Sequence, residues 1–198
     1  MDKNLIILFM IFFYSTQVLF VYYMYNCNNS VSSIICNKNY KYFFLFFTLL
    51  MGIGSVLYEY ERNDLYSQIL IFIILIGLHG LIYIDESHTI HYVFACFVFI
   101  GILFFMIRHC YLKECDIILS SSLFLEIIML LYTVIYFDKN IFYSESISIL
   151  NFAFFYFYLH IITEFDLYQK LIPDLTIPDL TIPDLKIPDL TVSLPIIE

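Results

Sequence analysis

Charged residues are scarce in this chain of 198 residues: they make up 14% of it, and only nine residues are Lys or Arg. No basic stripe or patch is present, so the sequence excludes nucleic acid as a partner by its electrostatic footprint. The formal net charge of −9 is spread over loops and the C-terminal tail, so it does not describe one acidic binding face. Tryptophan is absent, and no function follows from that.

Apolar residues fill the chain instead. They form 62% of it, and the mean hydropathy is +0.86. A helix needs about 20 mainly apolar residues to cross a bilayer, and its backbone polar groups must be paired within the span. We therefore predict an all-α fold, a transmembrane bundle of six helices over residues 1–168 in contact with the lipid bilayer. The six apolar stretches are 4–25, 43–58, 67–84, 91–107, 117–137 and 147–163.

Lysine and arginine in short loops indicate the orientation of such a bundle. If the N-terminus is cytosolic, the cytosolic side holds six of them and the other side holds three. We therefore predict that both termini are cytosolic. The first stretch exceeds the about 7–15 apolar residues of a signal peptide, which predicts an uncleaved signal-anchor. The six cytosolic residues are Lys3, Arg62, Arg108, Lys113, Lys170 and Lys186, and the other three are Lys38, Lys41 and Lys139.

The first loop carries two features typical of a lumenal surface. Cys27 and Cys36 could close a disulfide in an oxidising compartment. Asn28 begins the sequence Asn-Asn-Ser, an acceptor motif for N-glycosylation. Both features fall on the side that the charge distribution makes lumenal, and the alternative is that both are incidental.

Ionisable side chains inside an apolar stretch are costly and indicate a functional role. Glu126 lies in the middle of 117–137, His79 lies in 67–84, and His160 lies late in 147–163. We predict a polar cluster of these three residues, in which Glu126 pairs with a histidine across helices. Such a pair is expected to fix helix packing, and catalysis or a proton relay are the alternatives.

The loop between the third and fourth stretches holds four polar groups that could form a lumenal site: Asp85, Glu86, His88 and His91. Two histidines three residues apart beside carboxylates could bind a divalent metal. The loop lacks a tight ligand motif, so we assign no metal. The serines at 120–122 lie near the opposite membrane face. This separation argues against a hydrolase, which needs its serine, aspartate and histidine at one depth.

Small residues recur within the second and third stretches. They are Gly52, Gly54 and Ser55 in one, and Gly77 and Gly80 in the other. We expect them to let neighbouring helices approach closely, as small residues do in membranes.

The C-terminal residues 169–198 differ from the rest of the chain. The unit Ile-Pro-Asp-Leu occurs four times with a period of five residues, beginning at Ile172, Ile177, Ile182 and Ile187. Proline at this spacing prevents a continuous helix, so we predict a disordered cytosolic tail. The repeats are either a tolerated expansion or a multivalent motif that binds a cytosolic protein partner.

The order of these features resembles the damage-regulated autophagy modulator (DRAM) family of six-span membrane proteins. The likeness covers about residues 43–168. It includes the aromatic and charged run Tyr58-Glu59-Tyr60-Glu61-Arg62, a fourth stretch that opens at His91, and the run FFYFYLHIITEF at 154–165. The chain departs from the family before the last helix, where Glu145 stands without the family's Trp.

The resemblance implies six helices, cytosolic termini, residence in the lysosome, Golgi or ER rather than the plasma membrane, and no catalytic residues or cofactors. The function we predict is that of a non-enzymatic endomembrane protein that modulates autophagy, trafficking or lipid distribution. One alternative is a small transporter or channel that uses Glu126 and His79. A further alternative is a lipid-modifying intramembrane enzyme that uses Asp85, His88 and His91.

Overall fold

The computed structural model describes residues 3–26, 30–112, 116–136 and 141–162. The chain divides into two units, Met1–Glu164 and Phe165–Glu198, and all described residues belong to the first. The predicted tail with its four repeats lies outside the described residues. Within the described part every element is helical, which confirms the predicted all-α class.

Five of these helices are long and apolar enough to cross a membrane, so the chain is a multi-pass membrane protein. The sixth predicted stretch falls on α7 and on the π-helical turn η1 that follows it directly. A short helix in the first loop, α2, was not predicted. The helices are α1 Lys3–Met24, α2 Val31–Ile35, α3 Lys41–Glu61, α4 Leu65–Tyr83, α5 Thr89–Leu112, α6 Ile117–Ile135, α7 Ile141–Phe157 and η1 Tyr158–Ile162.

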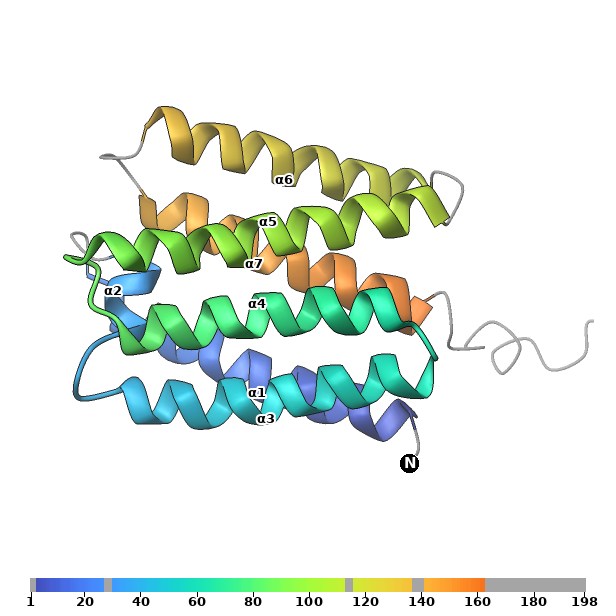
Figure 1. Ribbon diagram of the computed structural model, residues 1–198, viewed down its shortest axis with the longest axis horizontal. Coiled ribbons are helices and arrows are strands. Elements are labelled where there is room, and N and C mark those ends of the chain that lie inside the picture. The colour runs from blue at the N-terminus through green and yellow to red at the C-terminus, as the bar shows by residue number, and fades with distance from the viewer. Residues whose placement is uncertain (1–2, 27–29, 113–115, 137–140, 163–198) are drawn as a thin grey trace, which may run out of the picture. The chain divides into compact units, whose positions relative to one another are not determined.

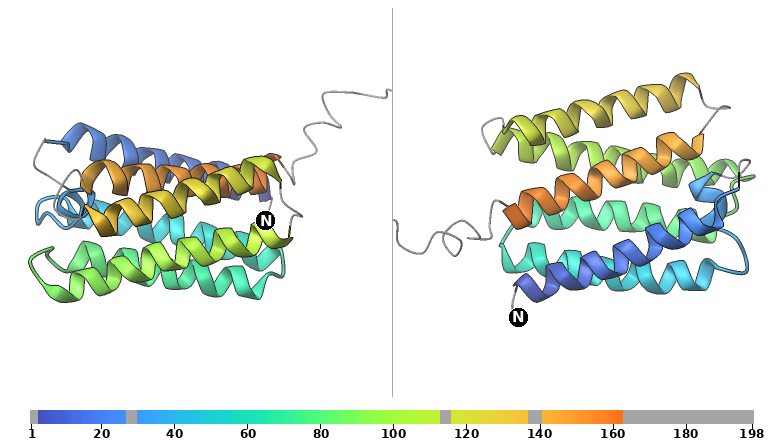
Figure 2. Two further views of the ribbon diagram at one scale, coloured as in Figure 1. Left: turned by 90° about the horizontal axis from the view of Figure 1, so that it is seen from above. Right: turned by 180° about the vertical axis from the view of Figure 1, so that it is seen from behind.

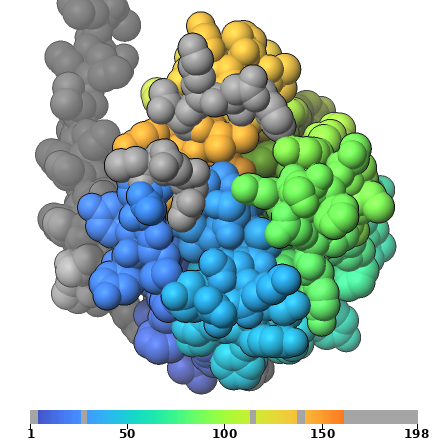
Figure 3. Space-filling model, turned by 90° about the vertical axis from the view of Figure 1, so that its left-hand side faces the viewer, coloured from blue at the N-terminus to red at the C-terminus, as the bar shows by residue number. Residues whose placement is uncertain are grey.

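The long helices run side by side (Figures 1 and 2). α4 packs on α3 and α5, α1 packs on α3, and α6 packs mainly on α7. The start of α1, the α3–α4 turn and η1 lie at one end of the bundle, and α2 lies at the other (Figure 1). Figure 3 looks onto the end that carries α2, where α2 and the start of α3 lie beside the α4–α5 connection.

Glycine permits the close contact of α4 with α5. A Cβ atom on Gly77 would lie 2.8 Å from the carbonyl oxygen of Phe94 and 2.7 Å from Cγ2 of Val98. A Cβ atom on Gly80 would run into the ring of Phe94. The prediction that small residues of the third stretch allow close helix approach is confirmed, since larger side chains would push the helices apart.

A tight turn joins α3 to α4 and shapes one end of the bundle. Asn63 has a φ of 57°, a left-handed conformation that asparagine adopts more readily than most residues. The turn sets Asp64 at the start of α4, where its Oδ1 accepts a hydrogen bond of 3.1 Å from the Ser67 backbone N–H. Such an N-cap stabilises the first turn of a helix. The turn also brings Asp64 to the same end of the bundle as Glu59 of α3 and Arg62, the residue that follows α3.

Candidate functional site

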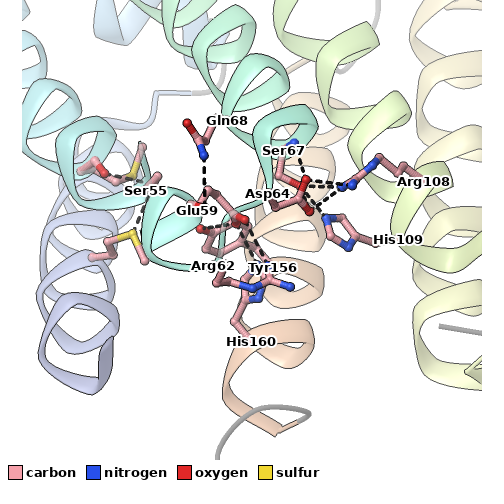
Figure 4. Close-up of polar contacts among 12 residues, drawn as sticks. Ser55, Glu59, Arg62, Asp64, Ser67, Gln68, Arg108, His109, Tyr156 and His160 are labelled. Atoms are coloured by element: carbon pink, nitrogen blue, oxygen red, sulfur yellow. Dashed lines mark hydrogen bonds and ion pairs between the residues drawn. The ribbon is translucent and has the colours of Figure 1, made fainter. Parts of the chain in front are cut away.

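A charged cluster lies around the α3–α4 turn (Figure 4), and Figure 1 shows this turn at the end of the bundle where α1 begins. Its first half is centred on Glu59 of α3, whose side chain is fully buried. His160 Nε2 lies 3.1 Å from Glu59 Oε1, and Arg62 Nη1 lies 3.1 Å from Glu59 Oε2. The Tyr156 hydroxyl donates a hydrogen bond of 3.1 Å to Glu59 Oε1. One carboxylate therefore joins the end of α3 to α7 and η1.

The second half is centred on Asp64. The Arg108 guanidinium of α5 donates two hydrogen bonds to this carboxylate, of 2.7 and 2.8 Å. The Ser67 hydroxyl lies 2.9 Å from Asp64 Oδ2 and 2.9 Å from His109 Nε2. Partial burial would raise the pKa of Asp64, but the hydrogen bonds from Arg108 and Ser67 lower it to about 2. Asp64 is therefore a carboxylate at neutral pH, and it ties α4 to α5.

The two halves adjoin through their histidines. The rings of His109 and His160 have centroids 6.1 Å apart, and both side chains are almost completely buried. In these contacts the Glu59 carboxylate faces the Arg62 guanidinium group, and the Asp64 carboxylate faces the Arg108 guanidinium group. Buried charges are stable in a protein only when they are paired in this way.

Sequence reasoning found one member of this cluster, His160, and missed the others as site residues. Arg62 and Arg108 lie near the ends of apolar stretches, where the sequence predicts only that they set the orientation of the bundle. A signal was present, since Glu59 and Arg62 are three residues apart and can therefore meet on one helix face. Hydropathy alone does not show whether such a pair points into the bundle.

The structure does not bring together the predicted trio of His79, Glu126 and His160. Glu126 of α6 is fully buried and faces α7, where it accepts hydrogen bonds from the Ser148 hydroxyl and, at 2.8 Å, from Asn151 Nδ2. His79 is bonded within its own helix, with Nδ1 2.8 Å from the Leu75 carbonyl oxygen. His160 instead meets Glu59. Glu126 and His79 are apart because α6 packs mainly on α7 rather than on α4. Glu126 and His160 are apart because Glu126 faces Ser148 and Asn151 of α7, whereas His160 lies beyond the end of α7 in η1.

The four loop residues also point to different partners. Asp85 accepts a hydrogen bond of 3.0 Å from the Ser87 backbone N–H, and Glu86 accepts one of 2.8 Å from the Ser30 hydroxyl. His91 is buried with Nδ1 2.7 Å from the Ile84 carbonyl oxygen, whereas His88 is exposed. In the part of the chain that the structure describes, no group of three or more His, Cys, Asp or Glu side chains could hold a metal.

The first loop is anchored by a residue of the last helix. Glu145 of α7 accepts hydrogen bonds of 2.8 Å from the Val31 backbone N–H and 3.1 Å from the Ser32 hydroxyl. Burial raises the pKa of the Cys36 thiol, whose sulfur lies 3.5 Å from the Ser33 carbonyl oxygen. Cys27 and Asn28 lie outside the described residues, so the disulfide and the glycosylation stay predictions.

A mainly apolar cavity of about 90 Å³, partly open to its surroundings, lies between the helices. Side chains of α1, α3, α4, α5 and α7 line it, and three of them carry hydroxyl groups: Tyr14, Ser55 and Tyr156. Tyr156 connects the cavity to the charged cluster because its hydroxyl is bonded to Glu59. Neither Glu126 nor His79 is among the described residues that line this cavity.

Comparison with family models, curated proteins and solved structures finds no match for this chain. The interpretation of the charged cluster and the cavity therefore rests on their own geometry. The resemblance to the DRAM family stays a prediction.

Proposed function

We propose that this chain is a non-enzymatic, six-span protein of an internal membrane, in the lysosome, Golgi or ER, that acts in lipid distribution, trafficking or autophagy. The observation that carries the non-enzymatic role is the pairing within the charged cluster. Glu59 is bonded to Arg62, and Asp64 to Arg108. Both carboxylates are thus bonded to guanidinium groups, which favours a role in holding the helices together over acid–base chemistry.

A sixth span is supported by the continuity of α7 with η1. α7 alone has 17 residues, but helical structure continues without a break through Tyr158–Ile162. The combined segment lies within the range of about 17–25 residues that spans a bilayer. Six spans place the start of α1 and the end of η1 on one side of the membrane. Arg62 and Arg108 lie at the end where α1 starts, and the positive-inside rule favours a cytosolic location for that end.

The cavity favours an apolar ligand over a polar solute, which supports lipid handling over a channel. A transporter or channel built on Glu126 and His79 is the alternative, and it predicts that these residues line a path. Both side chains are instead bonded to neighbouring groups.

An intramembrane enzyme is favoured by one contact, the 2.9 Å between the Ser67 hydroxyl and His109 Nε2. This distance suits a nucleophile and its base. However, Ser67 is fully buried, and its Oγ also accepts a hydrogen bond of 2.8 Å from Arg108. We expect a fluorophosphonate probe to leave Ser67 unmodified. Labelling that is lost in Ser67→Ala and retained in Ser122→Ala would establish the enzyme instead.

Two experiments test the proposed function. Tags at both ends should react with antibody once the plasma membrane alone is permeabilised, and a protected C-terminal tag would refute the six-span topology. Removal of the chain from cells should change the lipid composition of isolated internal membranes. Wild type and Tyr60→Leu should restore it, because Tyr60 is exposed, whereas Glu59→Leu should not. An unchanged lipid composition would refute the role in lipid distribution.

A further inference from the structure

The cavity inside the bundle lies at the depth of the bilayer midplane. Met10 and Tyr14 are near the middle of α1, and Val98 and Ile102 are near the middle of α5. Leu75 lies halfway along α4. The centre of a spanning helix lies at the centre of the hydrocarbon core. The ends of lipid chains meet at that depth, whereas headgroups and carbonyl groups lie near the two surfaces.

The hydroxyl groups that line the cavity all have hydrogen-bond acceptors elsewhere. The Tyr14 hydroxyl donates to the Ile149 carbonyl oxygen at 2.8 Å, and the Tyr156 hydroxyl donates to Glu59. The Ser55 hydroxyl lies 3.0 Å from the Met51 carbonyl oxygen (Figure 4). A ligand with acceptor groups would find these donors already engaged, and burying a polar group without a partner is costly. The cavity therefore selects a ligand segment that has no polar atoms.

The size of the cavity limits the length of that segment. An apolar cavity of about 150 Å³ lined by Leu, Ile and Phe stays dry and binds benzene. The present cavity of about 90 Å³ is smaller, so it can hold a few methylene groups and cannot hold a whole lipid. If the cavity were empty, the side chains that line it would lack contact atoms on one side and would lose dispersion attraction.

We infer that the cavity binds the methyl end of a lipid hydrocarbon chain, with the rest of the lipid remaining in the bilayer. This inference rests on the proposed function, because the depth of the cavity assumes that the helices span a membrane. It names the hydrocarbon chain of a lipid as the ligand class for the proposed lipid handling. An acyl chain fits better than a polar solute, because its last methylenes match the cavity in depth, polarity and size.

The test is site-resolved photocrosslinking of the full chain in phosphatidylcholine vesicles. One lipid probe carries a diazirine next to the terminal methyl of an acyl chain, and a second carries it next to the ester. Mass spectrometry then locates the modified residues. The terminal probe should label buried cavity residues such as Ile74 and Met10, and the ester-proximal probe should not. Terminal-probe label that is confined to lipid-facing residues such as Phe154 would overturn the inference.

A cavity-filling variant provides the second measurement. Ala153 lines the cavity, whereas Leu150 on the same helix is exposed to lipid. Ala153→Phe should lower labelling of cavity residues by about tenfold or more. The phenyl ring would fill the cavity, and even one methylene too many in an apolar pocket weakens binding by about tenfold or more. Leu150→Phe should leave it unchanged. If Ala153→Phe does not fold, Ala153→Leu serves the same purpose. Unchanged labelling in a folded cavity-filling variant would overturn the site.

The two proposals fail separately. Cavity labelling by the terminal probe, together with unchanged lipids in cells that lack the chain, would refute lipid handling and leave the chain-binding site standing. Altered lipids without cavity labelling would refute the site alone.

Discussion

Replacing Glu59 by leucine should destabilise the bundle strongly. Arg62 would then lose its ion pair with Glu59, and His160 and Tyr156 would lose the carboxylate oxygen that both contact. Breaking a buried charge pair by removing one partner costs about 3–5 kcal/mol. The Arg62 side chain is 15% exposed and can extend towards water, whereas Glu59 is fully buried. Arg62→Leu should therefore cost at least as much as Glu59→Leu.

The double variant distinguishes a buried pair from an exposed one. Replacing both partners of a buried ion pair with apolar residues is often neutral, so the Glu59→Leu, Arg62→Leu double variant should be more stable than either single variant. Unfolding by SDS titration in mixed micelles gives the three free energies of unfolding, with Tyr60→Leu as the exposed control on the same helix. Single-variant costs of about 0–1 kcal/mol, the range of a surface salt bridge, would refute the argument. Additive costs in the double variant would refute it as well.

Three further predictions concern other contacts. Glu126→Leu should lower the free energy of unfolding by about 1–2 kcal/mol through lost interhelical hydrogen bonds, and Glu126→Gln should cost less; equal costs would contradict this. The pKa of Asp64 in the folded state is lowered to about 2, whereas its pKa in the unfolded state is about 3.9. The stabilising contribution of Asp64 to the free energy of unfolding is therefore complete above pH about 3.9 and is lost as the pH falls from about 3.9 through about 2. Asp64→Asn should remove that part of the pH dependence of unfolding. Gly80→Leu should cost about 1–3 kcal/mol by overpacking against Phe94, whereas Ile76→Leu, at a lipid-exposed position of α4, should be nearly neutral in thermal-shift assays.

The helices could be predicted from the sequence because hydropathy reports directly on residence in hydrocarbon. The stretch 67–84 corresponds to α4 and 117–137 to α6, with small differences at the ends. α2 could not be predicted, because it has five residues and is held by a distant carboxylate, Glu145. Because Glu145 is far from α2 in the sequence, the residues around α2 do not indicate this contact.

The site could be predicted only in part, for a related reason. An ionisable residue in an apolar stretch must be buried or paired, which directed attention to Glu126 and His160. Hydropathy gives the depth of such a residue but not the direction in which it points around the helix. The predicted type of contact, a glutamate paired with a histidine across helices, occurs between Glu59 and His160 instead. Identifying that partner requires knowing which helices are neighbours.

The contacts of Glu126 have a consequence for biosynthesis. Its partners on α7, Ser148 and Asn151, follow it by 22 and 25 residues. At about 5–20 residues per second, the ribosome makes them roughly one to five seconds after the carboxyl group. During that interval α6 would expose an unpaired carboxyl group to lipid if it entered the bilayer alone, at a cost of about 2.5–3.5 kcal/mol at the helix centre. α6 is thus expected to remain at the translocon until α7 emerges, and the two helices then enter the membrane as one hairpin.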